Sequence, residues 1–182
     1  MKQVYLLTGR PGTGKTSLVK QVAILMKGKA GGFYTEEIRT SGVREGFRLI
    51  TLDGDGAVLA HVSIHSPYRV SKYGVDIGAL ERVGIPALRR AARQGELVII
   101  DEIGKMELFS PAFREAVSRM IDSETKVLGT IMLSPDPWVD AIKRRPQVYL
   151  ITVTRDNRQQ VLAELFRWLG ITESPELRYN VL

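Results

Sequence analysis

Residues 9–16 read Gly-Arg-Pro-Gly-Thr-Gly-Lys-Thr, and the prediction of the fold starts from them. They match the pattern G-x-x-x-x-G-K-[S/T] in full, after a predicted strand at Val4–Leu7 and before a predicted helix over Ser17–Met26. Backbone of this kind turns its N–H groups toward phosphate oxygens at a helix N-terminus. The pattern therefore predicts a triphosphate-binding loop made of Gly9, Arg10, Pro11, Gly12, Thr13, Gly14, Lys15 and Thr16.

A second motif supplies the acids that such a site needs. An apolar strand over residues 97–100 runs directly into Asp101-Glu102. We expect Lys15 to reach the β- and γ-phosphates, Thr16 and Asp101 to hold Mg²⁺, and Glu102 to take a proton from an attacking water. The predicted nucleotide-binding segment of this motif comprises Val98, Ile99, Ile100, Asp101, Glu102, Ile103, Gly104 and Lys105.

Strands and helices alternate along the rest of the chain. Further strands are predicted at 32–38, 126–133 and 147–153, and a hairpin at 46–64 turns at Asp53-Gly54-Asp55-Gly56. Helices are predicted at 78–94 with a break at Pro86, from Ser110-Pro111 to about 121, from Asp136-Pro137 to 144, and at 157–169. This alternation predicts a three-layer α/β fold with a mostly parallel sheet and an antiparallel hairpin added at one edge.

The adjacent aspartate and glutamate resemble the division of P-loop NTPases in which an extra strand lies between the two motif strands. Residues 126–133 are the candidate for that strand. Near its end, Thr130 or Ser134 is either a polar sensor of the γ-phosphate or a surface hydroxyl.

Composition excludes several other classes. The 182 residues are 44% hydrophobic and 25% charged, as in a globular domain, and no apolar stretch is long enough for a membrane span. The absence of Cys and the presence of only two His exclude thiolate and His-based metal sites. We expect a cytoplasmic monomer. The formal charge of +6 fits either a nucleic-acid binder or an enzyme of polyanionic phosphates.

Several stretches resemble one family closely. They are residues 32–39, 46–48, 73–76 and, most specifically, Asp-Glu-Ile-Gly-Lys-Met-Glu-Leu at 101–108. The chain resembles the small nucleoside-triphosphatases first associated with thermophiles, a family with a human cancer-related member. The resemblance implies one RecA-like P-loop domain over residues 1–170. It further implies Mg²⁺-dependent hydrolysis of ATP, GTP, CTP and UTP. Residues 171–182 form a tail beyond the resemblance.

Most of the other polar residues near the predicted site have either a functional or a structural interpretation. Glu36, Glu37 and Arg39, with Thr35, either position water and the γ-phosphate or form surface pairs. Lys105 either approaches phosphate or pairs with Glu107, and Asp76 is a helix cap. After the last strand, Arg155 and Asn157 are candidates for contact with the base; otherwise Asn157 is a cap and Arg158 a solvated charge.

The expected chemistry is in-line attack of water on the γ-phosphate. No arginine is unambiguously placed as a finger, although Arg39, Arg144, Arg155 and Arg158 are possible, so we expect slow turnover. The alternatives are a nucleotide or nucleoside kinase, for which Arg39, Arg44 and Arg48 are the hint, and a nucleic-acid-stimulated ATPase. The latter rests on Arg89, Arg90 and Arg93, which lack interleaved aromatics. A regulatory switch timed by hydrolysis is a further possibility.

Overall fold

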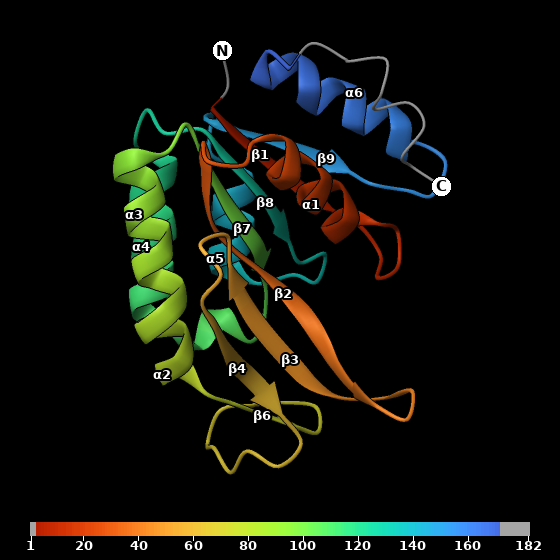
Figure 1. Cartoon of the computed structure of the whole chain (residues 1–182), viewed down its shortest axis with the longest axis vertical. Coiled ribbons are helices and arrows are strands. Elements are labelled where there is room, and N and C mark those ends of the chain that lie inside the picture. The colour runs from red at the N-terminus through yellow and green to blue at the C-terminus, as the bar shows by residue number, and fades with distance from the viewer. Residues whose placement is uncertain (1–2, 172–182) are drawn as a thin grey trace.

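A computed structural model describes residues 3–171, which form one nine-stranded sheet (Figure 1). Five neighbouring strands are parallel, in the spatial order β2 (Ala30–Thr40), β7 (Leu97–Ile103), β8 (Val127–Ile131), β1 (Val4–Thr8) and β9 (Val148–Thr152). The predicted strand between the two motif strands is confirmed, because β8 pairs with both β7 and β1. Of the predicted C-terminal tail, residues 172–182 lie outside the described part.

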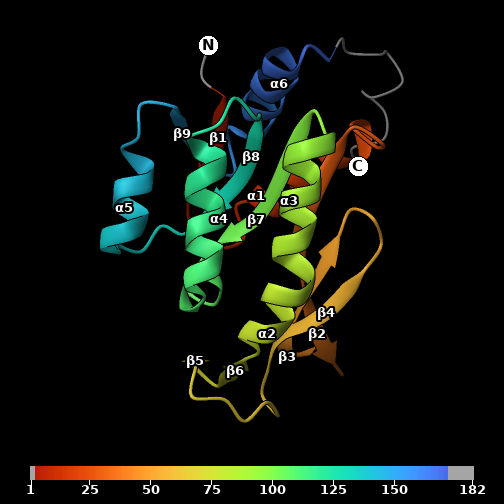
Figure 2. The same ribbon diagram turned by 90° about the vertical axis from the view of Figure 1, so that its left-hand side faces the viewer.

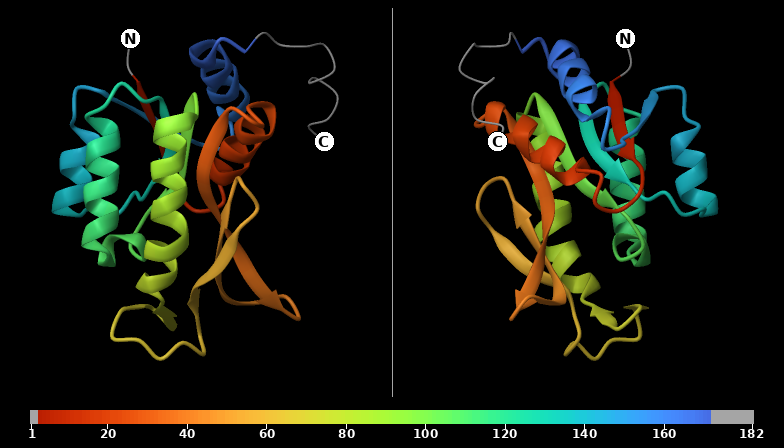
Figure 3. Two further views of the ribbon diagram at one scale, coloured as in Figure 1. Left: turned by 60° about the vertical axis from the view of Figure 1, so that its left-hand side comes forward. Right: turned by 90° about the vertical axis from the view of Figure 1, so that its right-hand side faces the viewer.

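Helices cover both faces of the parallel strands (Figures 2 and 3). On one face, α1 (Lys15–Leu25) and α6 (Arg158–Leu169) bury Leu18, Val22 and Leu165 against β1, β7 and β9. The other face packs against residues such as Leu88, Phe113 and Ile142, which come from α3 (Ile85–Gln94), α4 (Pro111–Ile121) and α5 (Pro137–Lys143). The three-layer α/β fold predicted from the sequence is confirmed. Its central strands are apolar throughout because both of their faces are covered.

The antiparallel part of the sheet is larger than predicted. The hairpin at residues 53–56 is confirmed and joins β3 (Val43–Thr51) to β4 (Gly56–His61). A second hairpin precedes it, because β2 continues to Thr40 and returns as β3 through Ser41 and Gly42. Both turn residues have positive φ, at 49° and 80°, as a tight two-residue hairpin turn requires. The sheet ends in the short strands β6 (Tyr73–Val75) and β5 (Arg69–Val70), which the sequence did not predict.

The helix predicted over residues 78–94 does not end at Pro86. It runs as α2 (Ile77–Ala79), a π-helical segment η1 (Leu80–Gly84) and then α3. Pro86 is the second residue of α3, which directly follows the π-helical segment, so the irregular turn of this continuous helix lies next to the residue that lacks an N–H donor. Asp76 caps α2 through the N–H of Ala79, as expected. The predicted caps at Ser110 and Asp136 are confirmed in the same way, each accepting from the first turn of its helix.

Within residues 3–171 no helix combines the length and the apolar character that a membrane span requires.

Candidate nucleotide site

The loop at residues 9–14 joins β1 to α1, as the motif requires. Gly9, Gly12 and Gly14 all have positive φ, and Gly14 begins α1 without a side chain to cap it. The first-turn amides of α1 therefore have no side-chain acceptor at the N-cap, which suits an anion. The ammonium of Lys15 folds back over this loop and donates to the carbonyls of Gly9 (2.9 Å) and Arg10 (3.0 Å). Thr13 Oγ1 also donates to the carbonyl of Arg10, while Arg10 and Pro11 are exposed.

The fold brings the two sequence motifs into contact. Thr16, at the start of α1, donates from Oγ1 to Oδ1 of Asp101 (3.3 Å), across 85 residues of sequence. The same Oδ1 accepts from Thr130 Oγ1 on β8 (2.5 Å). Asp101 is 1% exposed, and its other oxygen, Oδ2, is buried without a hydrogen-bond partner. Burial raises the pKa of Asp101, although the hydrogen bonds from Thr130 and Thr16 oppose this.

Thr130 has neither of the two predicted roles. It is fully buried and its hydroxyl is committed to Asp101, so it is neither a surface hydroxyl nor a direct sensor of a phosphate. Because β8 lies next to β7, Thr130 instead fixes the orientation of the carboxylate. Ser134 lies past the end of β8 and is exposed.

Glu102 follows Asp101 on β7 through a cis peptide bond, and its side chain is half-buried. It lies against Gly104, where an added Cβ would come within 2.4 Å of Glu102 Oε1. Burial and the neighbouring charge of Asp101 raise the pKa of Glu102, while the charge of Lys15 lowers it. Lys105 is exposed.

Four side chains of the predicted acidic segment are buried in the core. Val98, Ile99, Ile100 and Ile103 are completely buried, with Val98 and Ile100 in one core layer and Ile99 in the other. Their role as nucleotide contacts stays a prediction, and it would concern their backbone alone, because strands covered on both faces direct every apolar side chain into a core. Their role is to hold β7 in place, so that Asp101 and Glu102 lie at its end.

The polar residues of β2 are paired with one another or with α1. Glu36 accepts from Lys20 on α1 (2.5 Å), and Lys20 also lies over the ring of Tyr34. On the opposite face of β2, Glu37 binds Arg39 (2.6 Å) and Arg44 (2.8 Å). These contacts match the surface-pair reading for Glu36, Glu37 and Arg39. Thr35 pairs with Leu49 in the β2–β3 ladder.

The loop after β9 is organised by Asn157. Its Oδ1 accepts from the N–H of Thr154 (2.8 Å) and its Nδ2 donates to the carbonyl of Thr152 (2.9 Å). Asn157 therefore stabilises the loop through hydrogen bonds to its backbone, and its side chain does not cap α6. Arg155 is exposed in the same loop.

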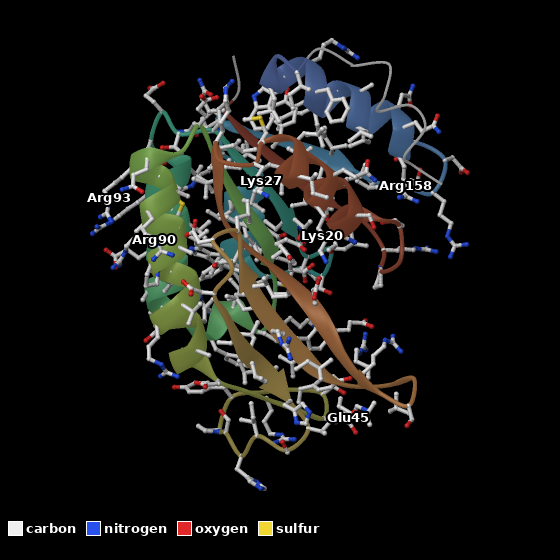
Figure 4. All side chains as sticks on the ribbon, viewed as in Figure 1. Lys20, Lys27, Glu45, Arg90, Arg93 and Arg158 are labelled. Carbon is white, nitrogen blue, oxygen red and sulfur yellow. The ribbon has the colours of Figure 1, made fainter. Side chains whose placement is uncertain are left out.

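Arg158 is not the solvated charge that the alternative reading suggests. It lies beside the first turn of α1 (Figure 4), and a Cβ added at Gly14 would meet its Nε at 2.6 Å. That Nε is buried and has no hydrogen-bond partner. An unpaired guanidinium nitrogen is thus packed against the phosphate loop, which agrees with the expectation that Arg158 is among the possible arginine fingers.

Comparison with known proteins is consistent with this geometry. The model of a family described as NTPase matches residues 4–166. The chain belongs to the NTPase family. Nucleoside-triphosphatase THEP1 of Thermotoga sp. (strain RQ2) is 50% identical over 160 residues, covering 88% of this chain and 91% of that relative. The human cancer-related nucleoside-triphosphatase is 38% identical, covering 91% of this chain and 95% of its own.

Solved structures of NTPase-family members share the architecture. The crystal structure of THEP1 from the hyperthermophile Aquifex aeolicus superposes with a TM-score of 0.84 at 39% identity, covering 91% of this chain and 98% of that one. The solution structure of a human cancer-related nucleoside triphosphatase gives 0.79 at 36% identity, covering 96% and 100%. The chain is thus an NTPase-family enzyme with the P-loop fold.

Glu107 is a buried acid near Glu102 and Asp101, and the only role predicted for it from the sequence is a pair with Lys105. It lies on η2 (Glu107–Phe109), is 4% exposed, and no ion pair joins it to Lys105 within the described residues. Burial raises the pKa of Glu107 to about 8, and the charge of Glu102 adds to the rise. The carboxyl is therefore mostly protonated at neutral pH. The sequence signal was an acid within an otherwise apolar turn, Met-Glu-Leu-Phe.

We expect Glu107→Gln to change how folding stability depends on pH. The folded carboxyl holds its proton up to a pKa of about 8, against 4.5 ordinarily, so its contribution is fully present below 4.5 and is lost as the pH rises through 8. The amide does not titrate. The free energy of unfolding of the variant, relative to the parent, should rise by about 1.4 kcal/mol per pH unit across that window. Urea unfolding at three pH values measures this.

Glu115→Gln is the matched control, because Glu115 is an exposed glutamate on α4. Its stability relative to the parent should be flat over the same range. Parallel pH profiles for Glu107→Gln and the parent would show that Glu107 is already ionised in the folded protein.

Proposed function

We propose that this NTPase-family enzyme hydrolyses nucleoside triphosphates to diphosphate and phosphate in a Mg²⁺-dependent reaction. The observation that carries the proposal is the contact between Thr16 and Asp101 (3.3 Å), which joins the phosphate loop to the acidic strand. Lys15 and Glu102 lie one residue from these two on the same elements. Relatives that are 38–50% identical are named nucleoside-triphosphatases, which supports the same activity here.

The residues around Asp101 fit a magnesium ion. A buried carboxylate oxygen without a partner is costly, and Asp101 Oδ2 is one. Mg²⁺ prefers carboxylate, hydroxyl and phosphate oxygens, so Thr16 and Asp101 would hold it together with the substrate. Within residues 3–171 no group of three or more His, Asp or Glu offers a separate metal site. When bound, the ion neutralises charge on the β- and γ-phosphates.

Residues of the chain itself would bind the phosphates and activate the attacking water. The loop amides and the Lys15 ammonium would bind the phosphate oxygens and stabilise the charge that develops during transfer. Glu102 would accept a proton from the attacking water, and the oxygen of that water would bond to the γ-phosphorus as the bond to the diphosphate breaks. A carboxylate with a raised pKa is a better base than an exposed one, and burial raises that of Glu102.

We expect broad use of ATP, GTP, CTP and UTP because the predicted contacts of the site are to the phosphates and not to the base. The loop from Gly9 to Thr16 can bind only the phosphates, which all four share. The candidates for contact with the base were Arg155 and Asn157. The amide of Asn157 is occupied by the backbone of Thr152 and Thr154, so it offers little discrimination between bases.

Slow turnover is part of the proposal. Of the four arginines that could act as a finger, Arg39 and Arg144 have other partners, and Arg158 lies against Gly14, where we expect it to contribute to binding and not to kcat. Arg39 is bound to Glu37, and Arg144 donates from Nε to the carbonyl of Asp140. Arg155 is exposed. P-loop enzymes that lack an arginine finger lose a factor of about 10³–10⁵ in rate.

Arg158 is the candidate for an additional phosphate contact. Its unpaired Nε lies against Gly14, within the loop that would surround the phosphates. We expect Arg158→Ala to raise KM for ATP about tenfold with little change in kcat, since a hydrogen bond between charged groups contributes about 1.5–3 kcal/mol. Arg167→Ala, at the exposed end of the same helix, is the control. Unchanged KM in Arg158→Ala would remove Arg158 from the site.

A product-resolved assay tests the function as a whole. The purified chain is incubated with each triphosphate, with and without Mg²⁺, and with nucleosides, nucleoside monophosphates, RNA or DNA added in turn. Release of phosphate into water, abolished by EDTA, is the expected result. A phosphorylated acceptor would replace the proposal with a kinase. Stimulation by nucleic acid is not expected. Of the three arginines on α3 that suggest a nucleic-acid-stimulated ATPase, Arg90 is already paired with Asp53 (2.9 Å).

The monomeric state, the cytoplasmic location and the limits of the domain stay predictions from the sequence.

A further inference from the structure

A cavity separate from the phosphate loop lies under the antiparallel part of the sheet. Its volume is about 560 Å³, within the range of small-molecule sites, and it lies between the β2–β3 hairpin, the β5–β6 hairpin and the chain after β7. Figure 1 shows these strands as an arm extending away from α1. The residues used below are Arg39, Arg44, Phe47, Val70, Lys72 and Met106.

The cavity has a cationic rim and an apolar floor. Arg39, Arg44 and Lys72 are exposed at the rim, while Phe47, Val70 and Met106 are half-buried. The one carboxylate paired with these cations among the described residues is Glu37, so the rim group keeps a net positive charge. An anion with an apolar or aromatic body matches this distribution.

The two arginines are held in position rather than free in solvent. Glu37 binds Arg39 through one carboxylate oxygen (2.6 Å) and Arg44 through the other (2.8 Å). Arg44 Nε also donates to Tyr73 Oη (3.0 Å), and its guanidinium lies 5.2 Å from the centre of the Phe47 ring. Preorganised guanidinium groups beside an aromatic ring suit a phosphate attached to a flat ring.

The cavity shares no residue with the phosphate loop or with the pair Asp101 and Glu102. Met106 follows Glu102 by four residues on the chain that leaves β7. Arg39 and Arg44 belong to the part of β2 and β3 that extends beyond the pairing of β2 with β7, which covers Ala30–Phe33 of β2. A ligand in this cavity can therefore be bound while a triphosphate occupies the loop.

We propose that this cavity binds a small phosphorylated compound with an aromatic ring, of which a nucleoside monophosphate is the simplest, as a second ligand beside the triphosphate. The phosphate binds the arginines and Lys72, and the ring packs on Phe47 and Met106. This inference goes beyond hydrolysis and does not depend on Lys15 or Glu102.

The test uses the full chain with Mg²⁺ and a non-hydrolysable ATP analogue at saturation, so that the phosphate loop is filled. AMP, GMP, CMP and UMP are then titrated by calorimetry. We expect at least one to bind with one-to-one stoichiometry, and inorganic phosphate or the free nucleoside to bind at least about tenfold more weakly, which is 1.4 kcal/mol.

Substitutions at the rim test whether the monophosphate binds in this cavity. Lys72→Glu reverses an exposed charge and should weaken binding about tenfold, while Arg44→Lys keeps the charge, loses the planar fork and should also weaken it. Lys27→Glu is the control, because Lys27 is an exposed lysine after α1, away from the arm (Figure 4). Melting temperatures confirm that each variant is folded.

The inference would be overturned by no binding of any monophosphate, by binding that the ATP analogue displaces, or by binding that Lys72→Glu and Arg44→Lys leave unchanged. An acidic peptide that binds through Lys72 where monophosphates do not would also overturn it. Lys15→Ala separates this inference from the proposed function. That variant should keep the monophosphate affinity of the cavity even if the phosphate loop no longer binds triphosphate.

Discussion

Glu102→Gln is expected to bind Mg²⁺-nucleotide as the parent does and to hydrolyse it about 10²–10⁴-fold more slowly, the range that a positioned general base contributes. The amide has the shape of the carboxylate, so it fits the same space against Gly104. It cannot accept a proton from water at neutral pH. The loss should therefore appear in kcat, with the dissociation constant for nucleotide close to that of the parent.

The pH dependence gives a second readout for Glu102. Because burial and the charge of Asp101 raise its pKa, the rate of the parent should fall on acidification at a higher pH than an ordinary glutamate would give. The rate of Glu102→Gln should not show this fall on acidification. Phosphate release and calorimetric nucleotide binding, measured from pH 5 to 9, check both expectations.

Glu115→Gln serves again as the matched control, since this exposed glutamate forms its ion pair with Arg119 on the same helix. Its rate and pH profile should match those of the parent. Hydrolysis by Glu102→Gln at the parental rate would show that Glu102 is not the base.

The sequence predicted the parts of the fold that depend on local pattern. The phosphate loop, its helix, the apolar strand before Asp101 and the caps at Ser110 and Asp136 are each set by residues within a few positions of one another. The position of β8 between β7 and β1 came from the Asp101-Glu102 pair, through a resemblance to one division of P-loop enzymes. Composition and periodicity alone do not determine that order.

The features that the sequence did not predict depend on contacts between distant segments. Thr130 meets Asp101 because β8 lies beside β7, and Arg158 meets Gly14 because α6 packs next to α1. Thr130 is a hydrophilic residue near the end of a strand, and Arg158 is one at the start of a helix. Side chains of both kinds are usually exposed to solvent at such positions. The turn at Ser41-Gly42 was overlooked because polar residues flank it on both sides, so no alternation of apolar residues marks the strands there.

The burial of Val98, Ile99 and Ile100 has the same origin. In a strand covered on both faces, a motif delivers its function at the last residue, and the residues before it serve the core. The functional positions of such a motif are therefore its polar residues at the end of the strand, buried in the case of Asp101 and partly exposed in the case of Glu102. On β7, Glu102 is the first residue with an exposed surface.

Lys15→Ala is expected to weaken both nucleotide binding and turnover. The ammonium would make charge-assisted hydrogen bonds to phosphate, each about 1.5–3 kcal/mol, so the dissociation constant for ATP should rise at least about tenfold. Because charge on the transferred group grows in the transition state, kcat should fall further, by about 10²–10³.

Folding should survive the Lys15→Ala substitution, because the bonds that Lys15 makes in the structure are two contacts to loop carbonyls, at Gly9 and Arg10. The melting temperature without nucleotide should therefore stay near that of the parent, while the stabilisation that Mg²⁺-ATP gives the parent should largely disappear. Lys27→Ala, which removes an exposed lysine, should keep both stabilisation and rate. A parental rate in Lys15→Ala would mean that the triphosphate binds elsewhere. The assignments of Thr16, Asp101 and Glu102 would then fail with it, because all three depend on the same phosphate position.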